Sequence, residues 1–137
     1  MTPNRLVLDT GVLISLFNRK DAQYEITKQG FMALEESHSR MVVPVAVVLE
    51  VSKRLLFDVN ATVMQTATEA MLEMLDVLDT TPRTIRDALE MIQSIKGWGA
   101  TLEDAILIQT ALVLDVPVWT LNYRDFAAVK TLRFWTP

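Results

Sequence analysis

Short apolar runs alternate along the chain with segments in which apolar residues recur at helical spacing. Five runs stand between polar or turn-forming residues, as strands do: Arg5–Leu8, Met41–Val43, Val77–Leu78, Val116–Leu121 and Leu132–Trp135. Pro117 has no backbone N–H, so it limits where the fourth of these strands begins. The pattern therefore predicts several short strands.

Helical periodicity fills the intervals between these runs. The predicted helices are Val12–Phe17, Tyr24–Glu36, Pro44–Phe57, Asn60–Met74, Thr81–Ile95 and Thr101–Leu114, followed by one turn at Asp125–Val129. Asn60, Thr81 and Thr101 are residues that cap helix N-termini, and Pro44 suits the first position of a helix. Strands that alternate with helices imply a parallel sheet covered by helices on both faces. Function in such sheets gathers beyond the carboxyl ends of the strands.

Length and composition narrow the class of protein. The 137 residues contain no linker or repeat, so we expect one domain over residues 1–137. The lack of cysteine excludes disulfides and thiolate zinc sites, and a single histidine, His38, excludes multi-histidine metal sites. The net charge of −4 argues against a broad basic face for nucleic acid. With no signal peptide or membrane-spanning run recognisable, we expect a cytoplasmic protein.

Two carboxylates in the first half of the chain have competing interpretations. Asp9 follows the first strand directly, where an aspartate commonly caps a helix or forms a turn. Glu50 lies within the apolar segment Pro44–Val51. A helix that is apolar all round is normally buried, and a buried carboxylate needs a partner or a metal. The alternative is an exposed Glu50 that pairs with Arg54, one helical turn later.

Polar residues in the second half are equally ambiguous when each is taken alone. Asp104 is the third helical residue after Thr101, a position from which a carboxylate can cap back. Asn122 and Asp125 follow the fourth strand and are ordinary turn residues.

Taken together, these residues indicate a metal site. Asp9, Asp104 and the Asn122–Asp125 segment fall at one edge of the expected sheet, and the helix of Glu50 can lean over that edge. Clustered like charges repel unless they are protonated or neutralised by a cation. Oxygen ligands without cysteine or histidine suit Mg²⁺ or Mn²⁺, and such sites hydrolyse phosphodiesters.

Four motifs occur in a characteristic order and spacing. They are Leu8-Asp9-Thr10 after the first strand, Glu50 in the third helix, Asp104-Ala105-Ile106-Leu107-Ile108 opening a late helix, and Thr120-x-Asn122-x-x-Asp125-Phe126 after the next strand. From Leu6 to Trp135 the sequence thereby resembles PIN-domain proteins, and more narrowly the VapC-like ribonucleases of toxin–antitoxin pairs.

The resemblance implies a three-layer α/β/α sandwich with a short, mostly parallel sheet. It also implies RNA cleavage dependent on Mg²⁺ or Mn²⁺, with Asp9, Glu50 and Asp104 as the core metal-site carboxylates. Asn122 and Asp125 match the family's fourth position. Because Asn122 stands where many members carry aspartate, either Asp125 is the fourth carboxylate or the site has only three. The residues that match positions supporting the site are Thr10 and Thr120. Relatives of this kind form homodimers and are silenced by an antitoxin.

Three residues near the expected site are candidates for contact with RNA. Arg124 and Lys96 offer phosphate contacts, and Trp98 offers base stacking. A solubilising role is the alternative for the two charged residues.

Two other functions remain open at this point. A PIN-like domain can be a non-catalytic module that binds RNA or serves as a structural unit. The tripeptide Asp9-Thr10-Gly11 has the form of an aspartic-protease motif, which requires a dimer with an all-β fold.

Overall fold

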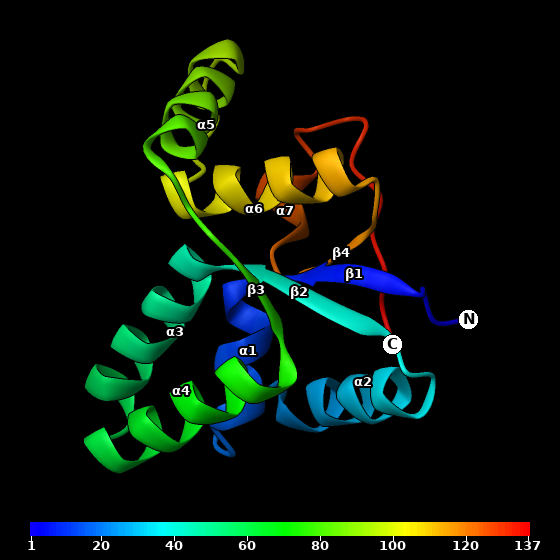
Figure 1. Cartoon of the computed structure of the whole chain (residues 1–137), viewed down its shortest axis with the longest axis vertical. Helices are drawn as coiled ribbons and strands as arrows, with labels where there is room; N and C mark the ends of the chain where they lie inside the picture. Colours follow the sequence, from blue (N-terminus) through cyan, green and yellow to red (C-terminus); the bar gives the residue numbers. More distant parts are fainter.

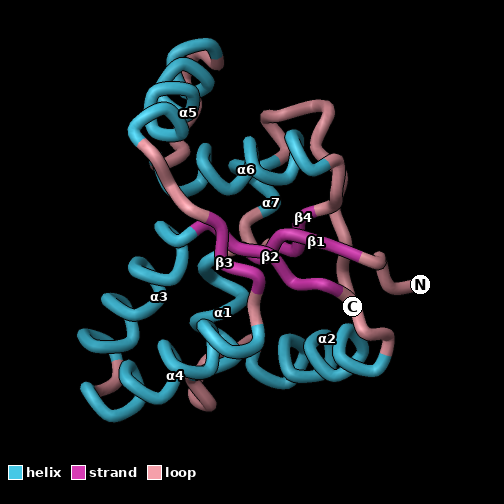
Figure 2. The backbone as a smooth tube through the Cα atoms, viewed as in Figure 1, coloured by secondary structure: helices cyan, strands magenta, loops and turns pink.

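Four parallel strands form the centre of the molecule. The computed structural model describes residues 1–137. The strands are β1 (Arg5–Leu8), β2 (Arg40–Pro44), β3 (Asp76–Leu78) and β4 (Val118–Trp119), in the order β3-β2-β1-β4. Strand β1 pairs Leu6 with Met41 of β2 and Leu8 with Trp119 of β4, so the first strand lies inside the sheet (Figure 2). All pairings are parallel, which confirms the predicted sheet.

Seven helices lie on the two sides of this sheet. They are α1 (Thr10–Phe17), α2 (Tyr24–Glu36), α3 (Val45–Asp58), α4 (Ala61–Met74), α5 (Pro82–Ser94), α6 (Leu102–Leu114) and α7 (Tyr123–Phe126). Figure 1 shows α1 to α4 on one side of the sheet and α5 to α7 on the other. Because both faces are covered, β1 reads as a nearly continuous apolar run. The three-layer α/β/α prediction is confirmed, and the all-β fold that an aspartic protease needs is excluded.

Side-chain caps begin three helices as predicted. Asn60 Oδ1 accepts a hydrogen bond from the Val63 N–H at 2.8 Å, and Thr81 and Thr101 form capping boxes at α5 and α6. Pro44 differs from the prediction. It pairs with Leu78 of β3 in an extended conformation and is the N-cap of α3, not its first helical residue.

The fourth strand is shorter than predicted. Of the segment Val116–Leu121, only Val118 and Trp119 form β4. Pro117 cannot donate to a neighbour, although its carbonyl accepts the Val7 N–H at 3.0 Å.

The predicted last strand, Leu132–Trp135, is also wrong. This segment makes a single bridge between Phe134 and Val118, because the two-residue β4 offers it no further length to pair with. The predicted turn at Asp125–Val129 is displaced as well. The helical turn α7 already begins at Tyr123.

Trp119 anchors the end of β4. Its side chain is 1% exposed and its ring centroid lies 5.2 Å from that of Phe31 and 5.1 Å from that of Trp135. Helix α2 approaches through Gly30, where a Cβ atom would lie 2.7 Å from Cζ2 of Trp119. This packing fixes the point at which the chain leaves the sheet toward Thr120.

None of the helices is both long and apolar enough to cross a membrane.

Candidate active site

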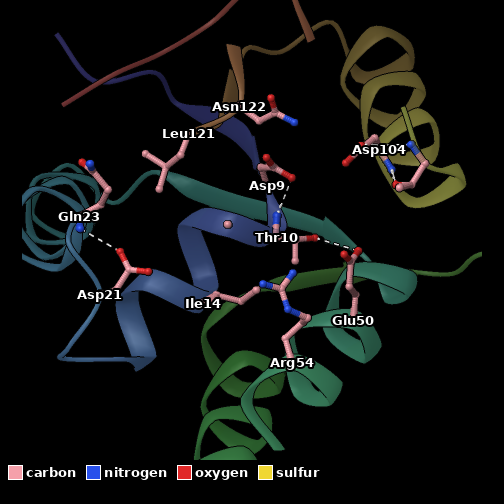
Figure 3. A pocket seen from close by; sticks show the side chains of 12 residues that line it. Asp9, Thr10, Ile14, Asp21, Gln23, Glu50, Arg54, Asp104, Leu121 and Asn122 are labelled. Atoms are coloured by element: carbon pink, nitrogen blue, oxygen red, sulfur yellow. Dashed lines mark hydrogen bonds between the residues drawn. The ribbon is translucent and has the colours of Figure 1, made fainter. Parts of the chain in front are cut away.

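Three predicted carboxylates line one open pocket at the carboxyl edge of the sheet. Asp9 follows β1, Glu50 lies on α3, which follows β2, and Asp104 lies in the first turn of α6. The pocket has a volume of about 390 Å³, and its wall also includes Thr10 and Asn122. Figure 3 shows Asp9 at its centre, with Asp104 and Glu50 reaching in from two separate helices. The parallel topology therefore brings these three carboxylates to one edge of the sheet.

Asp9 is the most buried of these carboxylates, with 5% of its surface exposed. Oδ1 accepts the Thr10 N–H at 2.7 Å, which caps α1, and Oδ2 accepts the Thr120 hydroxyl at 2.6 Å. The pKa of Asp9 is raised to about 6, mainly by burial and also by the charges of Asp104 and Glu50, against the hydrogen bonds from Thr120 and Thr10 that lower it. Asp9 therefore caps α1, and it is also a buried carboxylate whose negative charge a bound cation would stabilise.

Glu50 is half-buried, and its helix is more exposed than the apolar sequence around it suggested. Leu49, its neighbour, is 66% exposed. The alternative ion pair with Arg54 does not form, because Arg54 pairs with Asp58 instead, at 3.6 Å. Glu50 Oε2 accepts the Thr10 hydroxyl at 3.3 Å. Burial raises the pKa of Glu50, followed by the charge of Glu103.

Asp104 belongs to the capping box of α6 and also lines the acidic pocket. Its Oδ2 accepts the Thr101 N–H at 3.2 Å, and the Thr101 hydroxyl accepts the Asp104 N–H at 3.1 Å. Burial raises the pKa of Asp104, and the charges of Asp125 and Glu103 add to the rise while the bonds to Thr101 oppose it. The two interpretations of this residue therefore describe the same geometry.

Asn122 lines the acidic pocket, but Asp125 does not. Asp125 lines only the neighbouring pocket, which Asn122 also borders. Asn122 Nδ2 donates to Asp125 Oδ2 at 3.0 Å, so the side-chain oxygen of Asn122 is the atom left for a ligand. Asn122 N–H donates to the Thr120 hydroxyl at 2.8 Å, which ties this turn to Asp9.

The three residues predicted to contact RNA all line that neighbouring pocket. Lys96 and Arg124 are exposed there, and Trp98 is half-buried. The Trp98 indole N–H donates to the Asp125 carbonyl at 2.7 Å, which fixes the loop before α6 against α7. The tryptophan therefore has a structural contact in addition to any it makes with a substrate.

Sequence reasoning missed several residues of the acidic pocket. Asp21 and Gln23 come from the turn before α2, and Arg54 comes from α3. No sequence pattern marks the turn. Arg54 carried a usable signal, since it follows Glu50 by one helical turn and so shares its face.

An all-oxygen donor set of this kind fits a hard divalent cation. No three histidine, aspartate or glutamate side chains lie close enough together to hold an ion between them. Mg²⁺ typically keeps several waters and binds through one or two carboxylates, so it does not need such a closed cage. The buried Asp9, with its raised pKa and two facing carboxylates, is the observation that supports the fit.

Comparison with known proteins shows the same fold elsewhere. The chain matches VapC20 of Mycobacterium tuberculosis, a toxin that cleaves the sarcin–ricin loop, at 16% identity and a TM-score of 0.83, covering 96% of this chain and 99% of that one. It matches a chain of DNA-bound VapBC from Salmonella typhimurium at 18% identity and a TM-score of 0.75, with 97% and 98% covered. It matches a chain of VapBC-1 from nontypeable Haemophilus influenzae at 21% identity and a TM-score of 0.69, covering 96% of this chain and 97% of that one.

No curated protein sequence matches the chain significantly. The family model of the PIN domain matches residues 6–132, which is most of the chain. The chain belongs to the PIN-domain family.

Proposed function

We propose that this protein is a ribonuclease dependent on Mg²⁺ or Mn²⁺, and the toxin of a toxin–antitoxin pair. One observation carries the proposal: a buried Asp9 faces Glu50 and Asp104 in an open pocket at the carboxyl edge of a PIN-domain sheet. The VapC and VapBC structures that share the fold support the toxin assignment.

Asp9, Glu50 and Asp104 would hold the cation, with Asn122 or Asp125 completing the site. A bound divalent cation supplies Lewis-acid chemistry, which activates water and stabilises charge on a phosphate. The hydroxyl of Thr120 orients Asp9, and the hydroxyl of Thr10 bridges toward Glu50.

Water is the proposed nucleophile, because the acidic pocket contains no cysteine, histidine or serine, and the hydroxyls of its two threonines, Thr10 and Thr101, already contact Glu50 and the Asp104 N–H. Water would attack the phosphorus in line with the departing 3′-oxygen. Lys96 and Arg124 would hold the adjoining part of the strand by phosphate contact, and the ring of Trp98 would stack on a base.

Exposed apolar side chains support the proposed protein partners, an antitoxin and a second copy of the chain. Leu49 and Phe57 on α3 are 66% and 75% exposed, and Leu72 on α4 is 57% exposed. Helices α3 and α4 follow each other directly and pack together. Exposed apolar surface of this kind commonly marks protein interaction sites.

The test is cleavage of a mixture of cellular RNAs by purified protein in Mn²⁺. Asp104→Asn should reduce cleavage about a hundredfold or more, because it removes ligand charge worth several kcal/mol in the transition state. The asparagine can still accept the Thr101 N–H, so α6 keeps its cap.

Glu69→Gln is the matched control, since it removes one negative charge from an exposed position on α4. It should cleave like the wild type. Full activity in Asp104→Asn would contradict the catalytic assignment, and RNA binding without cleavage in the wild type would favour a non-catalytic module.

A further inference from the structure

Arg54 is the only basic residue that lines the acidic pocket. Its partner in the structure is Asp58, one turn later on α3, at 3.6 Å between Nε and Oδ2. That distance is too long for a good hydrogen bond, and both side chains are about half exposed. Exposed pairs of this kind contribute little, so another anion can readily replace Asp58.

The guanidinium is directed at the pocket and not at its carboxylates. Figure 3 shows the Arg54 side chain reaching from α3 toward Thr10 and Ile14, beside Glu50. It forms neither a hydrogen bond nor an ion pair with Glu50 or Asp9. It therefore makes no direct contact with the acidic cluster, although its charge lowers the pKa of Glu50.

On each of two sides the acidic pocket adjoins another pocket that contains basic residues among acidic ones. On one side Asn122 is shared with the pocket that contains Lys96 and Arg124. On the other side Glu50 and Arg54 are shared with a hollow between α3 and α6. Figure 3 shows Asn122 and Arg54 on opposite sides of Asp9. A strand that crosses Asp9 from the first side leaves past Arg54.

We propose that Arg54 binds a phosphate of the RNA strand beside the scissile one, and exchanges Asp58 for that phosphate. The inference rests on the proposed function. A polyanion carries a charge at every nucleotide, so neutralising only the scissile phosphate would leave its neighbour unpaired in an acidic pocket. A guanidinium binds phosphate oxygens with two parallel hydrogen bonds, which a distant aspartate at 3.6 Å does not match.

The experiment measures binding and cleavage of a short fluorescein-labelled single-stranded RNA. In the wild-type background, Arg54→Gln should raise KM about five- to tenfold with kcat within about twofold, because the contact is made equally before and during reaction. In the non-cleaving Asp104→Asn background it should raise Kd by the same factor. The slope of log Kd against log salt should fall by about 0.7, the value for one phosphate on a single strand.

Two further variants sharpen the result. Arg54→Lys keeps the charge and should recover part of the affinity but not all, since it loses the two-pronged contact. Asp58→Asn removes the competitor and should tighten binding about twofold.

Arg83→Gln is the matched control. Arg83 is also an exposed helical arginine paired with an aspartate four residues later, Asp87, at 3.2 Å, but it lies on α5 away from the acidic pocket. It should leave Kd and the salt slope unchanged. Melting curves of Arg54→Gln and Arg83→Gln should coincide, because each loses one exposed pair.

The outcomes separate the two proposals. Equal Kd, KM and salt slope in Arg54→Gln and Arg83→Gln would overturn the assignment, as would a loss confined to kcat. If the wild type binds the RNA without cutting it and Arg54→Gln weakens that binding, the phosphate contact stands while the nuclease proposal fails. A wild type that neither binds nor cuts would overturn both.

Discussion

Asp9 and Asp104 are both aspartates at the start of a helix, yet their surroundings are opposite. Asp9 is 5% exposed and is held by Thr120 across the sheet, 111 residues away in sequence. Asp104 is only half-buried and bonds to Thr101, three residues before it. Capping accounts for both hydrogen bonds of Asp104, whereas Asp9 carries more burial than a cap needs. The comparison suggests that burial, not capping, marks the carboxylate that most needs a cation.

The largest effect expected from this difference is on pH dependence without metal. The pKa of Asp9 is raised from 3.8 to about 6, so its contribution to stability is fully present below 3.8 and is lost as the pH rises through about 6. The shift corresponds to about 3 kcal/mol. In EDTA, the free energy of unfolding of the wild type relative to Asp9→Asn should therefore fall by about 3 kcal/mol between about pH 3 and about pH 7.

Urea titrations of both proteins across that pH range measure this effect. Glu50 and Asp104 are present in both proteins, so their own titrations largely cancel in the difference. Asp9→Asn loses one acceptor for the bonds from Thr10 and Thr120, a cost of about 1 kcal/mol, and should still be no less stable than the wild type at neutral pH. An Asp9→Asn variant that is far less stable there would make Asp9 a structural cap.

Metal binding should make the wild type more stable than Asp9→Asn, the reverse of the order expected in EDTA at neutral pH. At a hundredfold excess over Kd, Mn²⁺ should stabilise the wild type by about 2.7 kcal/mol through mass action, and Asp9→Asn by much less. Thermal melts with and without Mn²⁺ measure this. An equal rise in melting temperature for both proteins would mean that the ion binds away from Asp9.

The smallest difference should appear between the threonines that support the two aspartates. Thr120→Val leaves a buried carboxylate and the Asn122 N–H without their partner, which should cost about 1–3 kcal/mol and reduce cleavage. Thr101→Val loses an exposed cap, worth about 1 kcal/mol, and should affect cleavage less. Thr120→Ser restores the hydroxyl and is the control. Equal losses of activity in the two valine variants would mean that both aspartates depend alike on their neighbours.

The sequence predicted those strands and helix starts that are specified by residues close together along the chain. The run Arg5–Leu8 and the caps Asn60, Thr81 and Thr101 specify their elements within a few residues, and all four occur as expected. The length of β4 depends on what pairs with it, and the run Val116–Leu121 contains no information on that.

The candidate site shows the same division. Asp9 and Asp104 share one edge of the sheet because strands that alternate with helices are parallel, so this edge could be predicted. The segment around Glu50 is apolar on every side, and periodicity could not show that Leu49 faces solvent while Glu50 faces the pocket. Arg54 pairs with Asp58 and not Glu50, a choice between two equivalent helical spacings that only the fold decides.

The hydrogen bond from Thr120 to Asp9 has a consequence for the order of events during synthesis. The two residues are 111 positions apart, and the ribosome adds about 5–20 residues per second. Asp9 and Glu50 are therefore synthesised seconds before Asp104, Thr120 and Asn122. Because β4 pairs with the first strand, the pocket cannot assemble on a partial chain. The acidic pocket therefore forms only after nearly the whole chain has been synthesised.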